Sequence, residues 1–214
     1  RLQLHRESGA APQHQLVLDE LQGDDRHGRA HHRPRRDGDD LGVFVRRFDA
    51  GGIPLGDELQ VNTYTSGRQQ YASVAAAGTG EFVVVWSGPQ AGGGTGISAR
   101  RFSSEGVPLG DEFVVQETIS TYRHLTTSVA VTSGFSFVAA WDTGSQAFAR
   151  RFDSNGVSLG PSFLVSTEPV PPDTYLDRLG RVKADDTGAF VVTWAREDTL
   201  ETVAHYASRY GPGG

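Results

Sequence analysis

The sequence contains no cysteine and no methionine. Without cysteine the protein forms no disulfide and has no thiol chemistry. No run approaches the roughly 18 apolar residues of a membrane-spanning helix. The net charge of −6, from 20 basic and 26 acidic side chains, gives no reason to expect a nucleic acid or an anionic lipid surface as partner. The missing methionine suggests that the sequence is part of a longer chain.

Residues 1–40 also lack aromatic side chains, yet they hold five of the seven histidines. Such a segment buries little apolar surface, so we expect residues 1–40 to be disordered or to be translated from a shifted reading frame. A metal site at His27, His31 and His32 and a basic arm for a polyanion are the alternatives. The shifted frame is favoured because the repeat that follows would place a strand ending in tryptophan before Val43, and none is there.

An internal repeat dominates the rest of the chain. Arg-Arg-Phe occurs at 46–48, 100–102 and 150–152, each time followed by a Gly-containing turn and Leu-Gly, and a worn fourth copy puts Arg209 before Tyr210. The second arginines are Arg47, Arg101, Arg151 and Arg209. Their spacing gives a period of roughly 50 residues, which is typical of propeller blades or stacked β arrays.

Each copy contains four short apolar runs separated by turn residues. Runs such as Phe82–Trp86 are apolar at nearly every position, which is typical of strands buried on both faces. The sequence therefore predicts an all-β fold: a β-propeller-like array of four-stranded antiparallel sheets, with about three and a half blades and an incomplete ring. Within a repeat domain of residues 41–214 we expect blades at about 43–62 (partial), 71–115, 127–166 and 179–214.

The pattern Arg-Arg-Phe-Asp…Gly…Pro-Leu-Gly…Glu-Phe, followed later by Phe-Val-Val-Val-Trp, resembles repeats of large, uncharacterised bacterial surface or secreted proteins. The resemblance covers residues 42–210. It implies a β-propeller array at the cell surface or outside the cell, acting as an interaction scaffold without an assigned active site. The third copy departs from the pattern, since Ser158 replaces the proline and Pro161-Ser162 replaces Asp-Glu.

The repeated arginines are the first candidate site. Arg47, Arg101, Arg151 and Arg209 share strand faces with small or aliphatic residues, and a charge on an apolar face needs a partner. Two interpretations stay open for this central Arg set. Either the guanidiniums form a ring that binds carboxylate or sulfate groups, or they are structural and bond carbonyls or an acid of the adjacent blade, which we favour.

A second candidate site gathers aromatic and polar residues in the loops before successive blades, where Tyr64 and Arg68 also lie. We expect these residues to contact a ligand because they recur at one topological place. The speculative contact residues are Tyr71, Tyr122, Arg123, His124, Tyr175 and Arg178.

The leading expectation for function is a non-enzymatic scaffold that binds an unidentified protein or glycan through its blade loops, with no catalytic residue, metal or cofactor, and no insertion into membranes. A single calcium loop at Asp37–Gly42 is disfavoured against a solvated turn. The alternative is a propeller-type glycoside hydrolase or lyase acting on acidic polysaccharide, for which two carboxylates beside an arginine cluster would suffice. Candidates for that pair are Asp185, Asp186, Glu197 and Asp198.

Overall fold

The computed structural model describes residues 2–3, 15–19, 36–37, 40–117, 126–144, 146–166, 174–198 and 203–213. These residues form antiparallel β-sheets, with one 3-10 turn, η1 (Ser133–Phe135), as the exception. The predicted fold class, an all-β propeller-like array of four-stranded sheets, is confirmed. In the described part of the chain, no helix has the length and apolar character needed to cross a membrane.

Four sheets follow one another along the chain, and each is a meander in which consecutive strands pair. Sheet 1 consists of β1 (Leu2–Gln3), β2 (Gln15–Asp19), β3 (Phe44–Phe48) and β4 (Leu59–Gln60). Sheet 2 consists of β5 (Gln70–Ala76), β6 (Phe82–Pro89), β7 (Thr95–Phe102) and β8 (Phe113–Gln116). Sheet 3 consists of β9 (Thr127–Val131), β10 (Phe137–Asp142), β11 (Ala147–Phe152) and β12 (Phe163–Leu164). Sheet 4 has three strands, β13 (Thr174–Ala184), β14 (Phe190–Asp198) and β15 (Val203–Tyr210).

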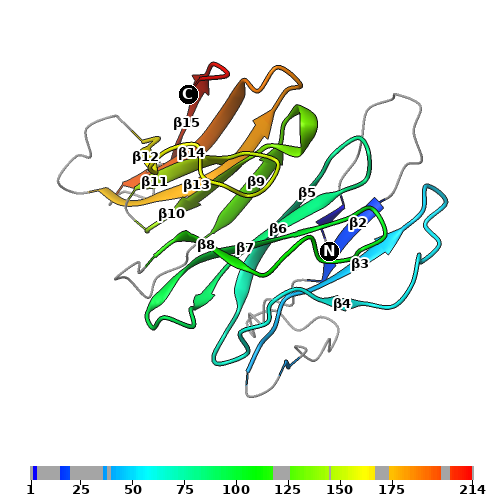
Figure 1. The fold of residues 1–214 in the computed structure, drawn as a ribbon. Coiled ribbons are helices and arrows are strands. Elements are labelled where there is room, and N and C mark those ends of the chain that lie inside the picture. The colour runs from blue at the N-terminus through cyan, green and yellow to red at the C-terminus, as the bar shows by residue number, and fades with distance from the viewer. Residues whose placement is uncertain are drawn as a thin grey trace.

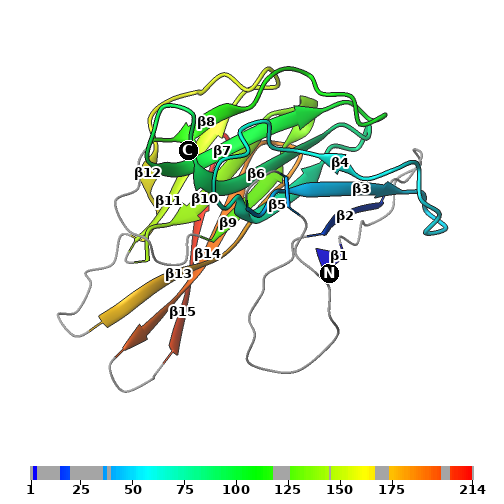
Figure 2. The same cartoon turned by 90° about the horizontal axis from the view of Figure 1, so that it is seen from below.

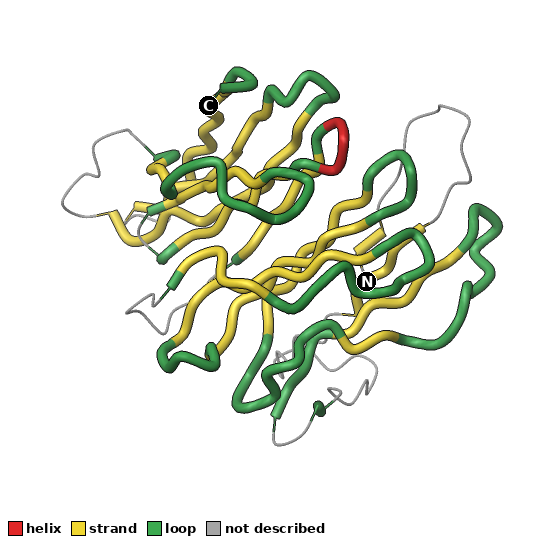
Figure 3. The backbone as a smooth tube through the Cα atoms, viewed as in Figure 1, coloured by secondary structure: helices red, strands yellow, loops and turns green. Residues whose placement is uncertain are grey.

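The sheets stack face to face in chain order, from sheet 1 to sheet 4 (Figures 1 and 3). The first strands β5, β9 and β13 lie against one another, whereas the last strands β8 and β12 lie at the outer edge. Sheets 2 and 3 therefore have a neighbour on each face. This explains why β6 and β10 are buried along almost their whole length, as the apolar runs of the sequence predict.

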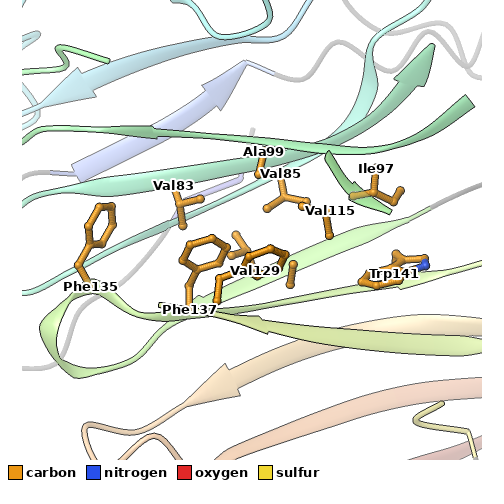
Figure 4. Packing of buried hydrophobic residues seen from close by; sticks show 11 residues of the cluster. Val83, Val85, Ile97, Ala99, Val115, Val129, Phe135, Phe137 and Trp141 are labelled. Atoms are coloured by element: carbon orange, nitrogen blue, oxygen red, sulfur yellow. The ribbon is translucent and has the colours of Figure 1, made fainter. Parts of the chain in front are cut away.

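Three apolar clusters fill the spaces between successive sheets. Figure 4 shows the middle cluster, in which Val83, Val85 and Ile97 of sheet 2 face Phe137 and Trp141 of sheet 3. The tryptophans of the middle strands belong to these clusters, Trp86 to the first and Trp141 to the middle one, and each is 1% exposed. Burial of such large side chains is a major source of stabilisation between the sheets.

The repeat also places an equivalent stacked aromatic pair in each of sheets 2 to 4. Phe82 stacks on Phe102 with centroids 4.9 Å apart, and Phe137 on Phe152 at 4.8 Å. Sheet 4 repeats the pair with a tyrosine, so that Phe190 stacks on Tyr210 at 4.8 Å. The phenylalanine of each Arg-Arg-Phe motif is thus a packing residue at the end of the third strand.

Within residues 1–40 the structure describes the strands β1 and β2 and residues 36, 37 and 40. β1 and β2 occupy in sheet 1 the places that β5 and β6 occupy in sheet 2, and β2 pairs with β3 from Gln15↔Phe48 to Asp19↔Phe44. The candidate metal ligands His27, His31 and His32 lie outside the described residues. The disorder or frame shift expected for the rest of this segment stays a prediction.

Candidate functional site at the linker face

The second arginine of each repeat connects its own sheet to the next one. Arg47 Nη1 donates a hydrogen bond to the Ser104 carbonyl at 2.6 Å, and Arg151 Nη1 donates one to the Pro212 carbonyl at 2.8 Å. Arg101 donates in the same way to the Ser154 carbonyl. Each acceptor lies in the turn after the third strand of the following sheet. Partial burial lowers the pKa of Arg101 from its usual value, while Asp153 opposes that shift.

The first arginine of the second and third repeats contacts the preceding sheet. Arg100 Nη1 donates to the Val61 carbonyl at 3.0 Å, and Arg150 Nη1 donates to the Val115 carbonyl at 2.9 Å. The same guanidinium lies over the phenylalanine of its own motif, 5.7 Å from the Phe102 ring centroid in sheet 2. The Arg-Arg pair is therefore a two-way connection between neighbouring sheets.

The central Arg set does not line the face where the first strands meet. Its members lie on the third strand of each sheet, away from the first strands that lie against one another. Arg47, Arg101 and Arg151 engage backbone carbonyls of the neighbouring sheet. No sheet follows sheet 4 among the described residues, and the Arg209 side chain is exposed on β15.

We call the end of the stack where β5 and β9 begin the linker face, because the connection from β4 to β5 lies there. Tyr71 lies at this end, in a bulge of β5 where the register shifts between Gln70 and Ser73. Its φ of 54° is in the left-handed region, which is costly for a residue with a side chain. The Tyr71 carbonyl accepts a hydrogen bond from Thr127 Oγ1 at 2.5 Å, so the bulge also joins sheet 2 to sheet 3.

A buried carboxylate lies at the corresponding end of sheet 3. Asp142, 1% exposed, accepts hydrogen bonds from the Thr126 hydroxyl, from Gly144 N at 3.1 Å and from Leu179 N of sheet 4 at 3.3 Å. Burial raises the pKa of Asp142, and the hydrogen bonds partly offset that rise. With its oxygens engaged by the protein, Asp142 is a structural junction between sheets 3 and 4.

Sheet 4 extends beyond its neighbours at the linker face (Figure 2). In sheet 3 the pairing of β9 with β10 ends at Trp141, whereas β13 stays paired with β14 beyond the equivalent Trp194 as far as Asp198. β15 follows β14 as far as Glu197↔Val203. We call this projection the ribbon: residues 174–178, 195–198 and 203–205.

Two of the expected contact residues, Tyr175 and Arg178, lie on the ribbon, and Tyr71 lies in the bulge of β5. Tyr122, Arg123 and His124 lie outside the described residues. The structure thus brings together the ribbon residues of the expected set, and Tyr71 lies at the same end of the molecule.

The four carboxylates considered for hydrolysis do not form one cluster. Asp185 lies in the turn between β13 and β14, where it accepts hydrogen bonds from Thr187 N at 2.9 Å and Ala189 N at 3.1 Å. The pKa of Asp185 is lowered mainly by the Thr187 hydroxyl. Glu197 and Asp198 lie at the opposite end of β14, which is roughly 25 Å away at the rise of an extended strand. The turn acids and the ribbon acids therefore cannot share a substrate bond.

Asp177 on the ribbon is an acid that sequence reasoning did not single out. Asp177 pairs with Arg196, and Asp198 lies two residues further along the same strand as Arg196. The signal available in the sequence was weak, because Asp177 follows a Pro-rich insertion where no strand was expected. Arg196 is 6% exposed, and its guanidinium lies 5.3 Å from the Tyr206 ring centroid. Within the described residues no cluster of His, Asp and Glu has the geometry of a metal site.

No protein-family model matches the sequence, and a search of the curated proteins finds no match. Solved structures with a similar arrangement of sheets do exist. One is a Hadza microbial sialidase, with a TM-score of 0.48 and 11% identity, covering 82% of this chain and 44% of its own. Another is an endo-arabinase from Bacteroides thetaiotaomicron, with a TM-score of 0.45 and 13% identity, covering 82% of this chain and 69% of its own. A thermostable family-43 glycoside hydrolase matches with a TM-score of 0.40 and 11% identity, covering 80% of this chain and 63% of its own.

The leading expectation for function, a non-enzymatic scaffold, is contradicted, as is the expectation that the chain is not an enzyme. The solved structures that it resembles are named as a sialidase, an endo-arabinase and a glycoside hydrolase. The chain spans less than half the length of the sialidase.

Proposed function

We propose that the chain is part of a propeller-type glycoside hydrolase or lyase that acts on acidic polysaccharide, with its site at the linker face beside the ribbon. An extracellular or cell-surface location, and a glycan as the binding partner, belong to the same proposal. A polymeric substrate is too large to enter most cells, so an enzyme that cleaves it acts where the polymer is.

The observation that carries the proposal is the register of the ribbon. Asp177 is paired with Arg196, and Asp198 is the diagonal neighbour of Asp177 on the adjacent strand. The register therefore puts two aspartates at neighbouring positions of adjacent strands. A pair of carboxyl groups is what glycoside hydrolysis requires.

The two acids have different places along the ribbon. Asp177 is the register partner of Arg196, whereas Asp198 lies at the end of β14. We assign Asp177 as the base that activates water and Asp198, at the end of β14, as the acid that protonates the leaving oxygen. Arg178, which pairs with Ala195, belongs to the opposite face of the ribbon and is therefore not part of the carboxylate pair.

The test is turnover of sugar polymers by the chain. Polygalacturonate and a sialylated oligosaccharide carry carboxylates, and arabinan provides a neutral comparison. Reducing-end release reports hydrolysis, and absorbance of an unsaturated uronate reports elimination. We expect Asp198→Asn and Asp177→Asn each to lower kcat by about 100-fold or more, in line with the loss of a general acid or base.

Glu197→Gln is the matched control, because neighbouring residues of a strand belong to opposite faces. Asp186→Asn removes a carboxylate at the far end of β14 and is a second control. Turnover that survives Asp198→Asn but is lost with Glu197→Gln would overturn the assignment of the pair. An absence of turnover with all three polymers would overturn the proposed function.

A further inference from the structure

The repeat provides an internal comparison for the outer face of sheet 4, which is the face turned away from sheet 3. In sheets 2 and 3 the equivalent faces are covered by the next sheet. Val85 and Ile97 of sheet 2, and Ala140 and Ala147 of sheet 3, are all 0% exposed. In each sheet the first of these residues precedes the tryptophan of the middle strand, and the second pairs with the residue that follows this tryptophan. In sheet 4 these two positions hold Thr193 and His205.

The first strand of sheet 4 also carries a polar residue where sheets 2 and 3 have a small apolar one. Ala75 and Ala130, which pair with the valine after the phenylalanine of the middle strand, are replaced by Lys183. In sheets 2 and 3 a serine of the first strand accepts a hydrogen bond from the next sheet. Ser73 Oγ accepts from Val129 N at 3.2 Å, and Ser128 Oγ accepts from Val182 N at 3.0 Å.

Sheet 4 has no serine for this bond. The position opposite Thr193 falls in a bulge that holds Arg181, whose N donates to Thr193 Oγ1 at 3.0 Å within the same sheet. Each replacement exchanges a small or aliphatic residue of an inter-sheet face for a polar or basic one. The outer face of sheet 4 is therefore not a further copy of the apolar faces inside the stack.

The basic residues frame a flat area. Lys183, Val191 and Arg209 form one cross-strand row, so the backbones of Lys183 and Arg209 are roughly 10 Å apart, twice the strand spacing. Arg181 lies further along β13, and His205 lies before Arg209 on the same side of β15. These four side chains are exposed, as is Val191 at 36%.

Acids occur at both ends of this area. Asp185 and Asp186 lie in the turn that joins β13 to β14, next to the row of Lys183 and Arg209. Arg209 adds to the lowering of the pKa of Asp185, for which the Thr187 hydroxyl is the main cause. At the other end, alternation along β14 gives Glu197 a position on the face of Val191 and Thr193. The basic residues therefore lie between the turn and the ribbon, along β13 and β15.

We infer that the outer face of sheet 4 is a binding surface for a carboxylated polysaccharide, which it holds by charge while the ribbon site acts on the same polymer. The face concentrates four basic side chains in a protein whose net charge is −6. An extended acidic polymer matches a flat area edged by the cations Arg181, Lys183 and Arg209, because spaced carboxylates can each meet a guanidinium or ammonium group. The ligand class rests on the proposed function, whereas the surface and its residues do not.

The experiment measures binding of polygalacturonate to the full chain carrying Asp198→Asn, so that no polymer is consumed. Arabinan is the neutral control polymer. We expect binding that weakens as salt screens the charges, a five- to tenfold loss of affinity with Lys183→Ala, and a larger loss with Arg181→Ala and Lys183→Ala together. Lys183→Arg keeps the charge and should keep the affinity.

Arg68→Ala is the matched control, because Arg68 is an exposed cation in the connection after sheet 1, paired with Asp40 at 3.4 Å. Equal affinity of the double alanine variant and its parent would overturn the inference, as would equal loss with Arg68→Ala. Sedimentation that shows the parent chain dimerising, and Lys183→Ala abolishing the dimer, would instead assign the face to a second copy. Binding without turnover would separate this inference from the proposed function.

Discussion

At the scale of single residues, the sequence left open whether the repeated arginines bind an anion or bond the protein. In the structure they donate hydrogen bonds to backbone carbonyls of the next sheet. Arg101 reaches the Ser154 carbonyl of the next sheet and the Leu109 carbonyl of its own, the latter at 3.4 Å. A guanidinium makes two such divergent bonds from its rigid fork of donors. We therefore expect Arg101→Ala to lower the free energy of unfolding by about 1–3 kcal/mol, the range for hydrogen bonds to charged groups.

Urea denaturation checks this expectation, with Arg68→Ala as control. The Arg68–Asp40 pair is exposed and should contribute less than about 1 kcal/mol. Arg101→Lys should fall between the parent and Arg101→Ala. If Arg101→Ala were as stable as Arg68→Ala, the arginine would not connect the sheets in solution.

Asp142 makes a second residue-scale prediction, concerning pH. Its folded pKa is raised by burial, so between the two pKa values the folded state holds a proton that the unfolded state has already lost. The contribution of Asp142 to stability is then largest below the unfolded pKa of an aspartate and decreases as pH rises from there through the folded pKa. Asp142→Asn cannot titrate. The stability advantage of the parent over Asp142→Asn should accordingly shrink with rising pH, measured by urea denaturation at several pH values; an advantage that grows with pH would contradict the burial argument.

At the scale of elements, much of the fold was predictable because its signals are local. The runs Phe82–Trp86 and Phe137–Trp141 are apolar throughout, and the structure makes them middle strands buried on both faces. The extension of sheet 4 was not predictable in this way. Residues 174–178 have no apolar run, and they are strand because β14 supplies their backbone partners. The same reason hid Asp177: its partner Arg196 is on the next strand, and only the register relates the two.

The contacts between elements also could not be predicted from the sequence. The acceptors of Arg47 and Arg101 are backbone carbonyls of the next sheet, far away along the chain, and a carbonyl is present at every residue. The sequence indicated that these arginines needed partners, and it left open whether the partner was the protein or an anion. The positive φ of Tyr71 was likewise not predictable from the sequence, because it depends on a bulge in the pairing of β5 with β6 and not on the residue type.

At the scale of the whole molecule, the described sheets form a one-dimensional array in which the main contacts are between neighbouring sheets. Sheets 2 and 3 are covered on both faces, whereas sheet 4 is covered on one, and β15 alternates between exposed and half-buried positions near its end. Local opening depends on how much apolar packing must be lost. We expect amide protons of β6 and β10 to exchange more slowly than those of β15, by roughly two orders of magnitude or more.

Hydrogen exchange followed by mass spectrometry measures this order along the chain. The same experiment bears on the basic face of sheet 4, because a polymer held by side-chain charges leaves the backbone of β15 open, whereas a further sheet packed on Val191 and Ala207 would protect it. Slow exchange in β15 equal to that in β10, in the absence of polysaccharide, would mean that sheet 4 is an internal sheet of a larger assembly. Fast exchange in β15, unchanged by protein concentration, is the outcome that a solvent-facing binding surface requires.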